Sequence, residues 1–203
     1  MVGKTNAISS SFRLIVSGYT GTYDGSSHTV TASVPPAYAS NTTIRYSTNN
    51  SSWSYSSPSR TDAGTTTVYV RATNPNFETI TESTTITINP APVTLTANSD
   101  SIMYNGRSQS VSGYTCSVPG IYFSGVSASG SGTNVGTYTV TIRGATVNET
   151  TDYTENYLVT SIVNGTLTIT KASASSLGLS VSDYSGSYDG SSHSVSVYVY
   201  DSS

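Results

Sequence analysis

The chain has 203 residues, of which only 9% are charged, and its formal net charge is −3. Eight Lys and Arg residues without a basic cluster provide no electrostatic footprint for nucleic acid, and no apolar run approaches the roughly 18 residues of a membrane span. Because Thr, Val, Ile and Tyr are plentiful and the net charge is small, the composition argues against disorder and favours a folded all-β protein.

The first predicted strands lie within residues 12–48. FRLIVS (12–17) comes first, and Asp24-Gly25 then separates GTY from SHTVTASV. Asp-Gly between two β runs predicts a hairpin, because such tight turns need a residue with φ > 0. TTIRYST (42–48) is the next strand, and it turns through NNSS to return as WSYS.

Two alternating strands complete this region. In TDAGTTTVYVRAT (61–73), Val68, Val70 and Ala72 share one face. TESTTITIN (81–89) alternates Ile with Thr in the same way. An apolar residue at every second position predicts half-buried antiparallel strands.

The same phrases then return. Tyr23-Asp24-Gly25 reappears as Tyr104-Asn105-Gly106 and as Tyr188-Asp189-Gly190, at a spacing of about 81 to 84 residues. TNVGTYTVTIRG (133–144) matches TDAGTTTVYVRA (61–72), and GTLTITKASAS (165–175) matches TTITINPAPVT (84–94). A polar phrase that returns with its surroundings intact indicates a building unit.

The period predicts two full repeats, at residues 8–90 and 91–171, and the truncated start of a third at 172–203. Pro90 and Pro92 mark the first joint, where proline favours extended backbone. We expect short, stiff joints between neighbouring repeats. The opening strands of the third repeat bury too little to be stable alone, so we expect them to be disordered, packed on the second repeat, or paired with another chain.

Each repeat offers about six or seven short strands separated by turns. This pattern predicts an all-β fold of tandem immunoglobulin-like β-sandwich domains with a partial third repeat.

The sequence resembles the MBG-type, bacterial immunoglobulin-like repeats of large cell-surface proteins. The residues that carry the resemblance are YDGSSHTV, IRYSTNNSSWSYSSP, TDAGTTTVYVRATNPNF and TTITINPAPVT, and it is clearest in the first repeat. The resemblance implies a secreted protein of the bacterial cell surface, a stalk or adhesin, with no enzyme activity. It also implies a tyrosine corner, a place that Tyr138 fits. The first repeat has Thr66 there, so its corner must be stabilised differently.

The histidines and the Asp-Gly pairs allow both a chemical and a structural interpretation. His28 and His193 hold equivalent positions, where the middle repeat has Gln109. A catalytic or metal-binding His would not tolerate Gln, so we interpret both as hydrogen-bonding residues. Calcium needs several converging oxygens. We therefore interpret Asp24, Gly25, Asn105, Gly106, Asp189 and Gly190 as turn residues.

An aromatic trio is the candidate ligand-binding group. Trp53, Tyr46 and Tyr55 offer flat apolar faces with polar tips on which a sugar could stack. The alternative is that Trp53 covers a hairpin or the edge of the core. The second repeat lacks the trio.

The remaining reactive side chains indicate little chemistry. The single Cys116 is expected to be a small buried side chain. Lys4 and Lys171 lie at the repeat junctions, where an intramolecular isopeptide bond is not expected.

The sequence supports two functions. The first is a non-catalytic structural or stalk region of an extracellular, adhesin-like protein, whose contacts are with neighbouring repeats of the same chain. The second is a module that binds a host glycan or protein through the aromatic trio. We predict no enzyme activity, no cofactor, no metal, no nucleic acid and no membrane span in this chain.

Overall fold

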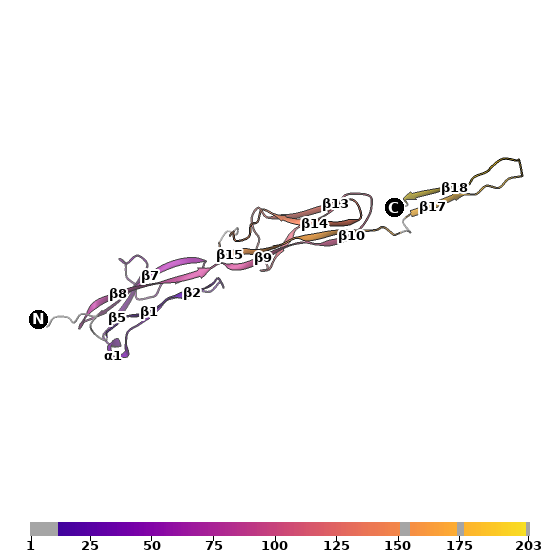
Figure 1. The fold of residues 1–203 in the computed structure, drawn as a ribbon. Coiled ribbons are helices and arrows are strands. Elements are labelled where there is room, and N and C mark those ends of the chain that lie inside the picture. Colours follow the sequence, from indigo (N-terminus) through magenta and orange to yellow (C-terminus); the bar gives the residue numbers. More distant parts are fainter. Residues whose placement is uncertain (1–11, 151–154, 174–176, 202–203) are drawn as a thin grey trace. The chain divides into compact units, whose positions relative to one another are not determined.

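The computed structural model describes residues 12–150, 155–173 and 177–201. The first, second and third segments are residues 8–90, 91–171 and 172–203. Almost every regular element among the described residues is a strand, and the exception is the short helix α1 (Pro36–Ala39). The all-β prediction is confirmed (Figure 1). Within the described residues, no helix is long and apolar enough to cross a membrane.

The residues group into two compact units. One comprises the described parts of Met1–Thr94, Cys116–Gly125 and Ala145–Ser161, and the other those of Leu95–Thr115, Val126–Gly144 and Ile162–Ser203. Parts of the second segment therefore belong to the same unit as the first. The division at residues 90 and 91 stays a prediction.

A four-stranded sheet is the centre of the first segment. Its strand order is β2 (Tyr19–Thr22), β8 (Phe77–Asn89), β7 (Gly64–Asn74) and β5 (Thr43–Ser47). β7 and β8 form a long antiparallel hairpin, whereas β2 pairs with β8 in parallel (Figure 1). The alternation predicted for residues 61–73 is confirmed, because Val68, Val70 and Ala72 are fully buried.

Two short antiparallel pairs accompany this sheet. They are β1 (Ile15–Ser17) with β4 (Thr31–Ser33), and β3 (His28–Thr29) with β6 (Ser59–Arg60). The core gathers Val30 with Val68, Val70, Ile86 and Ile88 of the main sheet. Val16 and Ala32 of the β1–β4 pair pack against it, so the first segment has two layers.

The second segment contributes two further sheets. The five-stranded sheet has the order β10 (Asp100–Met103), β16 (Gly165–Thr170), β14 (Gly136–Arg143), β13 (Ser127–Gly132) and β11 (Gln109–Ser112). The three-stranded sheet has the order β12 (Tyr114–Cys116), β9 (Ala91–Ala97) and β15 (Tyr157–Val163). β8 ends at Asn89 and β9 begins at Ala91, so the joint is as short as predicted.

The first two segments pair their strands in the same register. Tyr19 of β2 lies opposite Ile86 in a parallel pair, and Asp100 of β10 lies opposite Leu167 in another. Gly64 faces Ile88, just as Gly136 faces Ile169. These partners occupy equivalent places in the repeated phrases.

The hairpin prediction for Asp24-Gly25 is wrong. β2, which precedes the pair, bonds to β8, whereas β3, which follows it, bonds to β6. In the second segment, β10 and β11 likewise lie at opposite edges of one sheet. Asp-Gly specifies only a local reversal of the backbone. Which strands the flanking segments pair with depends on how apolar residues in distant parts of the chain are buried together.

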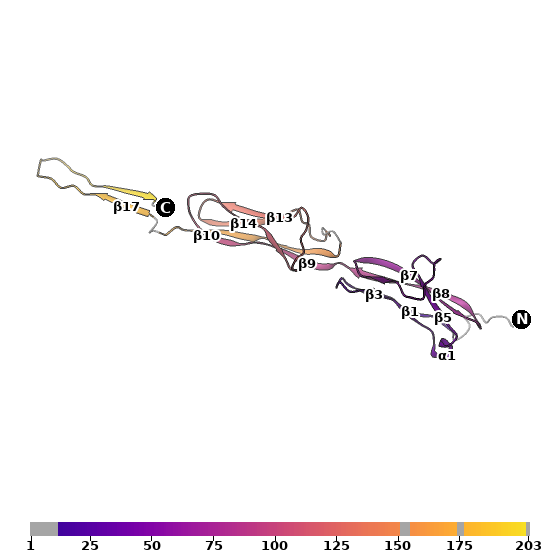
Figure 2. The same ribbon diagram turned by 180° about the vertical axis from the view of Figure 1, so that it is seen from behind.

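The described part of the third segment is an antiparallel hairpin of β17 (Leu177–Ser182) and β18 (Ser196–Asp201) (Figures 1 and 2). Leu179 and Val181 of β17 face Val199 and Val197 of β18, and all four side chains are more than half exposed. The structure thus gives these residues regular pairing while their apolar face stays open.

Candidate functional site

The repeated Tyr-Asp/Asn-Gly phrase builds the same corner in each segment. Asp24 Oδ1 accepts a hydrogen bond from the backbone N–H of Ser26 at 2.8 Å, and Asp189 does the same for Ser191. In the second segment, Asn105 Oδ1 accepts from the N–H of Arg107 at 3.0 Å. The glycine that follows has φ between 73° and 75° in all three corners, a conformation that favours glycine. These contacts and the positive φ describe a local reversal of the backbone at each corner.

A stacked Tyr–His pair supports the corner of the first segment. The rings of Tyr19 and His28 lie 3.8 Å apart and nearly parallel. His28 Nε2 lies 3.1 Å from Asp24 Oδ1 and donates to that carboxylate. A Cβ atom at Gly21 would collide with the Tyr19 ring, so only glycine leaves room for the stack.

The third segment repeats this arrangement. Tyr184 stacks on His193 at 3.8 Å, and His193 Nε2 lies 2.9 Å from Asp189 Oδ1. Gly186 occupies the place of Gly21, and a Cβ atom there would also collide with the tyrosine. Each His therefore hydrogen-bonds to the Asp of its corner and stacks on the Tyr, in agreement with the interpretation of both as hydrogen-bonding residues.

The second segment lacks all three members of this set. It has Asp100, Ile102 and Gln109 where the other segments have Tyr, Gly and His. The amide of Gln109 donates to the backbone oxygen of Met103 at 3.1 Å and so joins the two sides of the corner. In the first segment the glycine leaves room for the tyrosine ring and the imidazole stacks on it, so the three side chains form one contact set.

The carboxylates at these corners are electrostatically stabilised. The backbone N–H of Ser26 lowers the pKa of Asp24, and the hydrogen bond from His28 lowers it further. The pKa of Asp189 is lowered by the N–H of Ser191 and then by His193. Hydrogen bonds to the charged form favour ionisation. These carboxylates are therefore turn-stabilising acceptors.

The two tyrosine-corner positions differ as expected. Tyr138 donates its hydroxyl to the backbone oxygen of Asn134 at 2.9 Å. In the first segment, Arg60 Nε donates to the oxygen of Asp62 at 2.8 Å, and its other nitrogens bond to the Ala63 oxygen and to Thr66. A guanidinium from β6 thus takes the place of the phenol, and the prediction of a different stabilisation is confirmed. Nothing in the sequence pattern singled out Arg60.

The structure separates the predicted aromatic trio. An isolated bridge places Tyr46 of β5 opposite Ser54, with two backbone hydrogen bonds of 2.8 Å. Paired residues share a face of the sheet. Tyr46 packs against the core, whereas Trp53 and Tyr55 lie on the outer face.

Two arginines accompany the outer pair of aromatic residues. Arg45 Cζ lies 4.4 Å from the centre of the Tyr55 ring, and Arg45 Nη2 donates to the Tyr55 hydroxyl at 2.6 Å. Arg71 Cζ lies 4.1 Å from the Trp53 ring. Cation–π contacts of this kind hold a guanidinium in place. We call Arg45, Arg71, Trp53 and Tyr55 the arginine–aromatic face.

A compact turn positions Trp53 and Tyr55. The side chain of Asn49 accepts hydrogen bonds from the N–H groups of Ser51 and Ser52 and from the hydroxyl of Ser47. Asn50 adopts φ 58°, a conformation that Asn tolerates. The NNSS phrase thus returns the chain beside β5, as the sequence predicted.

Asn156 makes side-chain hydrogen bonds to residues more than 90 positions away in the sequence. Its side chain is almost fully buried. Its Oδ1 accepts from the N–H of Ala63 at 2.7 Å, its Nδ2 donates to Asp62 Oδ1 at 3.0 Å, and its backbone oxygen accepts from Ala91. Nearby, Tyr157 packs edge-on against Tyr23. Sequence reasoning missed this residue because nothing local distinguishes it from the other asparagines.

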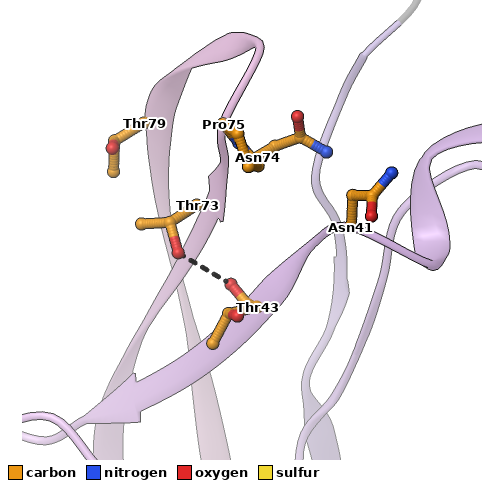
Figure 3. Close-up of a pocket in the computed structure, with 6 residues that line it drawn as sticks. All are labelled: Asn41, Thr43, Thr73, Asn74, Pro75 and Thr79. Atoms are coloured by element: carbon orange, nitrogen blue, oxygen red, sulfur yellow. Dashed lines mark hydrogen bonds between the residues drawn. The ribbon is translucent and has the colours of Figure 1, made fainter.

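Described residues of the first unit line two hollows that bear on function. One, of about 370 Å³, is lined by Asn41, Thr43, Thr73, Asn74, Pro75 and Thr79 (Figure 3). Its lining has no charged group, and Asn74 is engaged with Thr42 and with the N–H of Asn76. The other, of about 250 Å³, lies beside the Asn156 network and is lined in part by Gly64, Asn89, Pro90, Thr150 and Glu155.

The other singled-out residues do not assemble into a site. In the described ranges, no three His, Cys, Asp or Glu side chains are placed to hold a metal ion. The prediction that Cys116 is buried is wrong, because its place at the end of β12 leaves it partly exposed. Lys171 is exposed, and Lys4 lies outside the described residues.

No family model matches the chain, and no curated protein matches it. The chain is similar to a solved structure from Bacteroides ovatus, the mixed-linkage glucan utilization locus protein SGBP-B in complex with a mixed-linkage heptasaccharide. The identity is 13%, the TM-score is 0.24, and the match covers 74% of this chain and 42% of that one. The chain thus spans less than half of that protein.

Proposed function

We propose that the chain is a non-catalytic structural region of a bacterial extracellular surface protein, built from tandem immunoglobulin-like sandwiches of the MBG type. The observation that carries the proposal is the shared register of the first two segments, in which β2 and β10 form equivalent parallel pairs with β8 and β16. Equivalent pairings at equivalent sequence positions are what a repeated mechanical unit requires.

The joint supports the same function. Asn89 and Ala91 belong to consecutive strands, so only Pro90 separates β8 from β9. Proline restricts the backbone where the chain passes from one strand to the next. The Asn156 network adds hydrogen bonds to the Asp62–Ala63 turn. A spacer needs such a short and restrained connection, since a flexible tether would transmit neither direction nor force.

The polar residues with catalytic potential are engaged in structural contacts. His28 and His193 each bond to the Asp of their own corner and stack on a tyrosine. These contacts stabilise turns, which suits a structural role.

Force spectroscopy tests the proposal. The chain is pulled from its ends while the contour length released in each unfolding event is measured. We expect two events that each release about 80 residues, or roughly 26–29 nm of extended chain before the folded length is subtracted. Extension of the whole chain without discrete events would contradict a load-bearing function.

A second candidate function is ligand binding on the outer face of β5 and β7. The observation that favours it is the exposure of Tyr55, which is 69% accessible although its ring is positioned by Arg45. A glycan array probed with the chain and with Trp53→Ala is the test. Binding that is lost in the variant supports a glycan-binding module, and no binding to any glycan leaves the structural function alone.

A further inference from the structure

We propose that the arginine–aromatic face binds the carboxylate of an acidic sugar, a uronic acid residue within a glycan, with Arg45 and Arg71 as the carboxylate ligands. The inference rests on the second candidate function and names its ligand class. It starts from the register of β5 and β7, in which Arg45 lies directly opposite Arg71.

Two like charges in direct cross-strand opposition are unfavourable. Nothing nearby in the protein neutralises them, because the ion pairs among the described residues are His28–Asp24 and His193–Asp189. On the adjacent strand, Thr81 faces Arg71, and Glu82 faces Val70 on the opposite side of the sheet. The pair is thus a site of two positive charges in a chain whose net charge is −3.

The aromatic rings position the guanidinium groups without neutralising them. Tyr55 accepts one hydrogen bond from Arg45, and Trp53 covers one side of Arg71. Within the described part of the chain, Arg71 Nε is buried and has no hydrogen-bond partner. Because this Nε is covered, an anion would meet the guanidinium groups at their terminal nitrogens, where it would relieve the unfavourable opposition of two like charges.

The geometry selects the class of ligand. Guanidinium groups bind carboxylates with paired, charge-assisted hydrogen bonds. The rings of Trp53 and Tyr55 beside them offer apolar surface for the C–H face of a pyranose. A uronic acid carries both features on one ring, whereas a neutral sugar leaves the arginines unpaired.

The second segment contains a matched control. Arg143 of β14 is the repeat equivalent of Arg71. It lies opposite Ser127 of β13, so no second arginine faces it across the strands, and it is exposed. Arg143→Gln therefore removes the same charge from the same kind of strand without touching the proposed site.

The experiment titrates the full chain with trigalacturonate and with its methyl ester, a neutral form of the same sugar, while amide shifts are followed by NMR. We expect trigalacturonate to shift the amides around Arg45, Trp53 and Arg71, with the ester binding about tenfold more weakly. Arg45→Gln and Arg71→Gln should each weaken binding about tenfold, and Arg143→Gln should leave it unchanged.

Other outcomes overturn the inference. Equal binding of the acid and its ester would show that the carboxylate is not recognised, although the glycan is bound. Binding of a polyglutamate peptide but not of trigalacturonate would replace the sugar by an acidic polypeptide. Shifts that avoid β5 and β7 would place the site elsewhere. Because the wild-type shifts alone locate the site, the test does not depend on the variants folding, and none of these outcomes bears on the force-spectroscopy test of the structural function.

Discussion

Asn156→Ala tests whether the buried amide stabilises the first unit. The substitution removes the acceptor for the N–H of Ala63, now 2.7 Å away, and the donor to Asp62, now 3.0 Å away. The backbone hydrogen bond from Ala91 to the oxygen of residue 156 remains available to Ala. The perturbation is therefore confined to two side-chain contacts.

The expected cost follows from these two hydrogen bonds. Each contributes about 0.5–1.5 kcal/mol net, so their loss destabilises the unit by about 1–3 kcal/mol. The Asp62 side chain is exposed, so water can satisfy its freed oxygen and the cost stays within that range. Asn156→Asp should cost at least as much, because a carboxylate cannot donate to Asp62 and repels it.

Urea unfolding of the full chain measures the effect, with the first unit followed by tryptophan fluorescence because Trp53 is the single Trp. Asn41→Ala is the matched control, since Asn41 lies in the same unit as Asn156 and Trp53 and is exposed. The control should change the unfolding free energy by less than about 0.5 kcal/mol. An Asn156→Ala effect no larger than the control would refute the reasoning.

Three further predictions concern the corners. The pKa of Asp24 is lowered in the folded state, so its contribution to stability is present above its unfolded pKa of about 3.9 and is lost as the pH falls through the folded value. Asp24→Asn keeps the turn, as Asn105 does. The unfolding midpoint of this variant should fall less steeply than that of the wild type as the pH is lowered from about 5 to 2. An identical pH dependence of the two midpoints would contradict this. Tyr138→Phe should lower the unfolding free energy by about 0.5–1.5 kcal/mol, measured in urea, through loss of one hydrogen bond. Arg60→Met retains much of the side-chain volume but removes three hydrogen bonds, and should cost about 1.5–4.5 kcal/mol; a neutral result would mean that water serves the corner equally well.

The sequence alone determined the secondary structure and the turns. Alternation in residues 61–73 predicted which side chains of β7 are buried, because a strand exposes successive residues on opposite faces. Gly25, Gly106 and Gly190 were predictable as turn positions because a positive φ is a local requirement that glycine meets. Repetition of the Tyr-Asp/Asn-Gly motif at a spacing of about 81 to 84 residues indicated a recurring unit.

The sequence also contains a pattern of three substitutions that can be interpreted only with the structure. Tyr19, Gly21 and His28 have counterparts in the third segment, and all three differ in the second. A comparison of the repeats therefore shows that the three residues that form the stacked pair are all replaced in the second segment. Its meaning required the ring contact, since sequence spacing does not reveal which side chains touch.

Only the tertiary structure decided which strands are neighbours, and every site depends on that choice. Strand pairing depends on the joint burial of residues that are far apart in the sequence. A local sequence pattern therefore does not reveal which strands pair. The parallel pairing of β2 with β8, the guanidinium of Arg60 in the corner and the opposition of Arg45 and Arg71 all follow from it. Tyr46 is parted from Trp53 and Tyr55 for the same reason, because the bridge to Ser54 fixes which face each ring occupies.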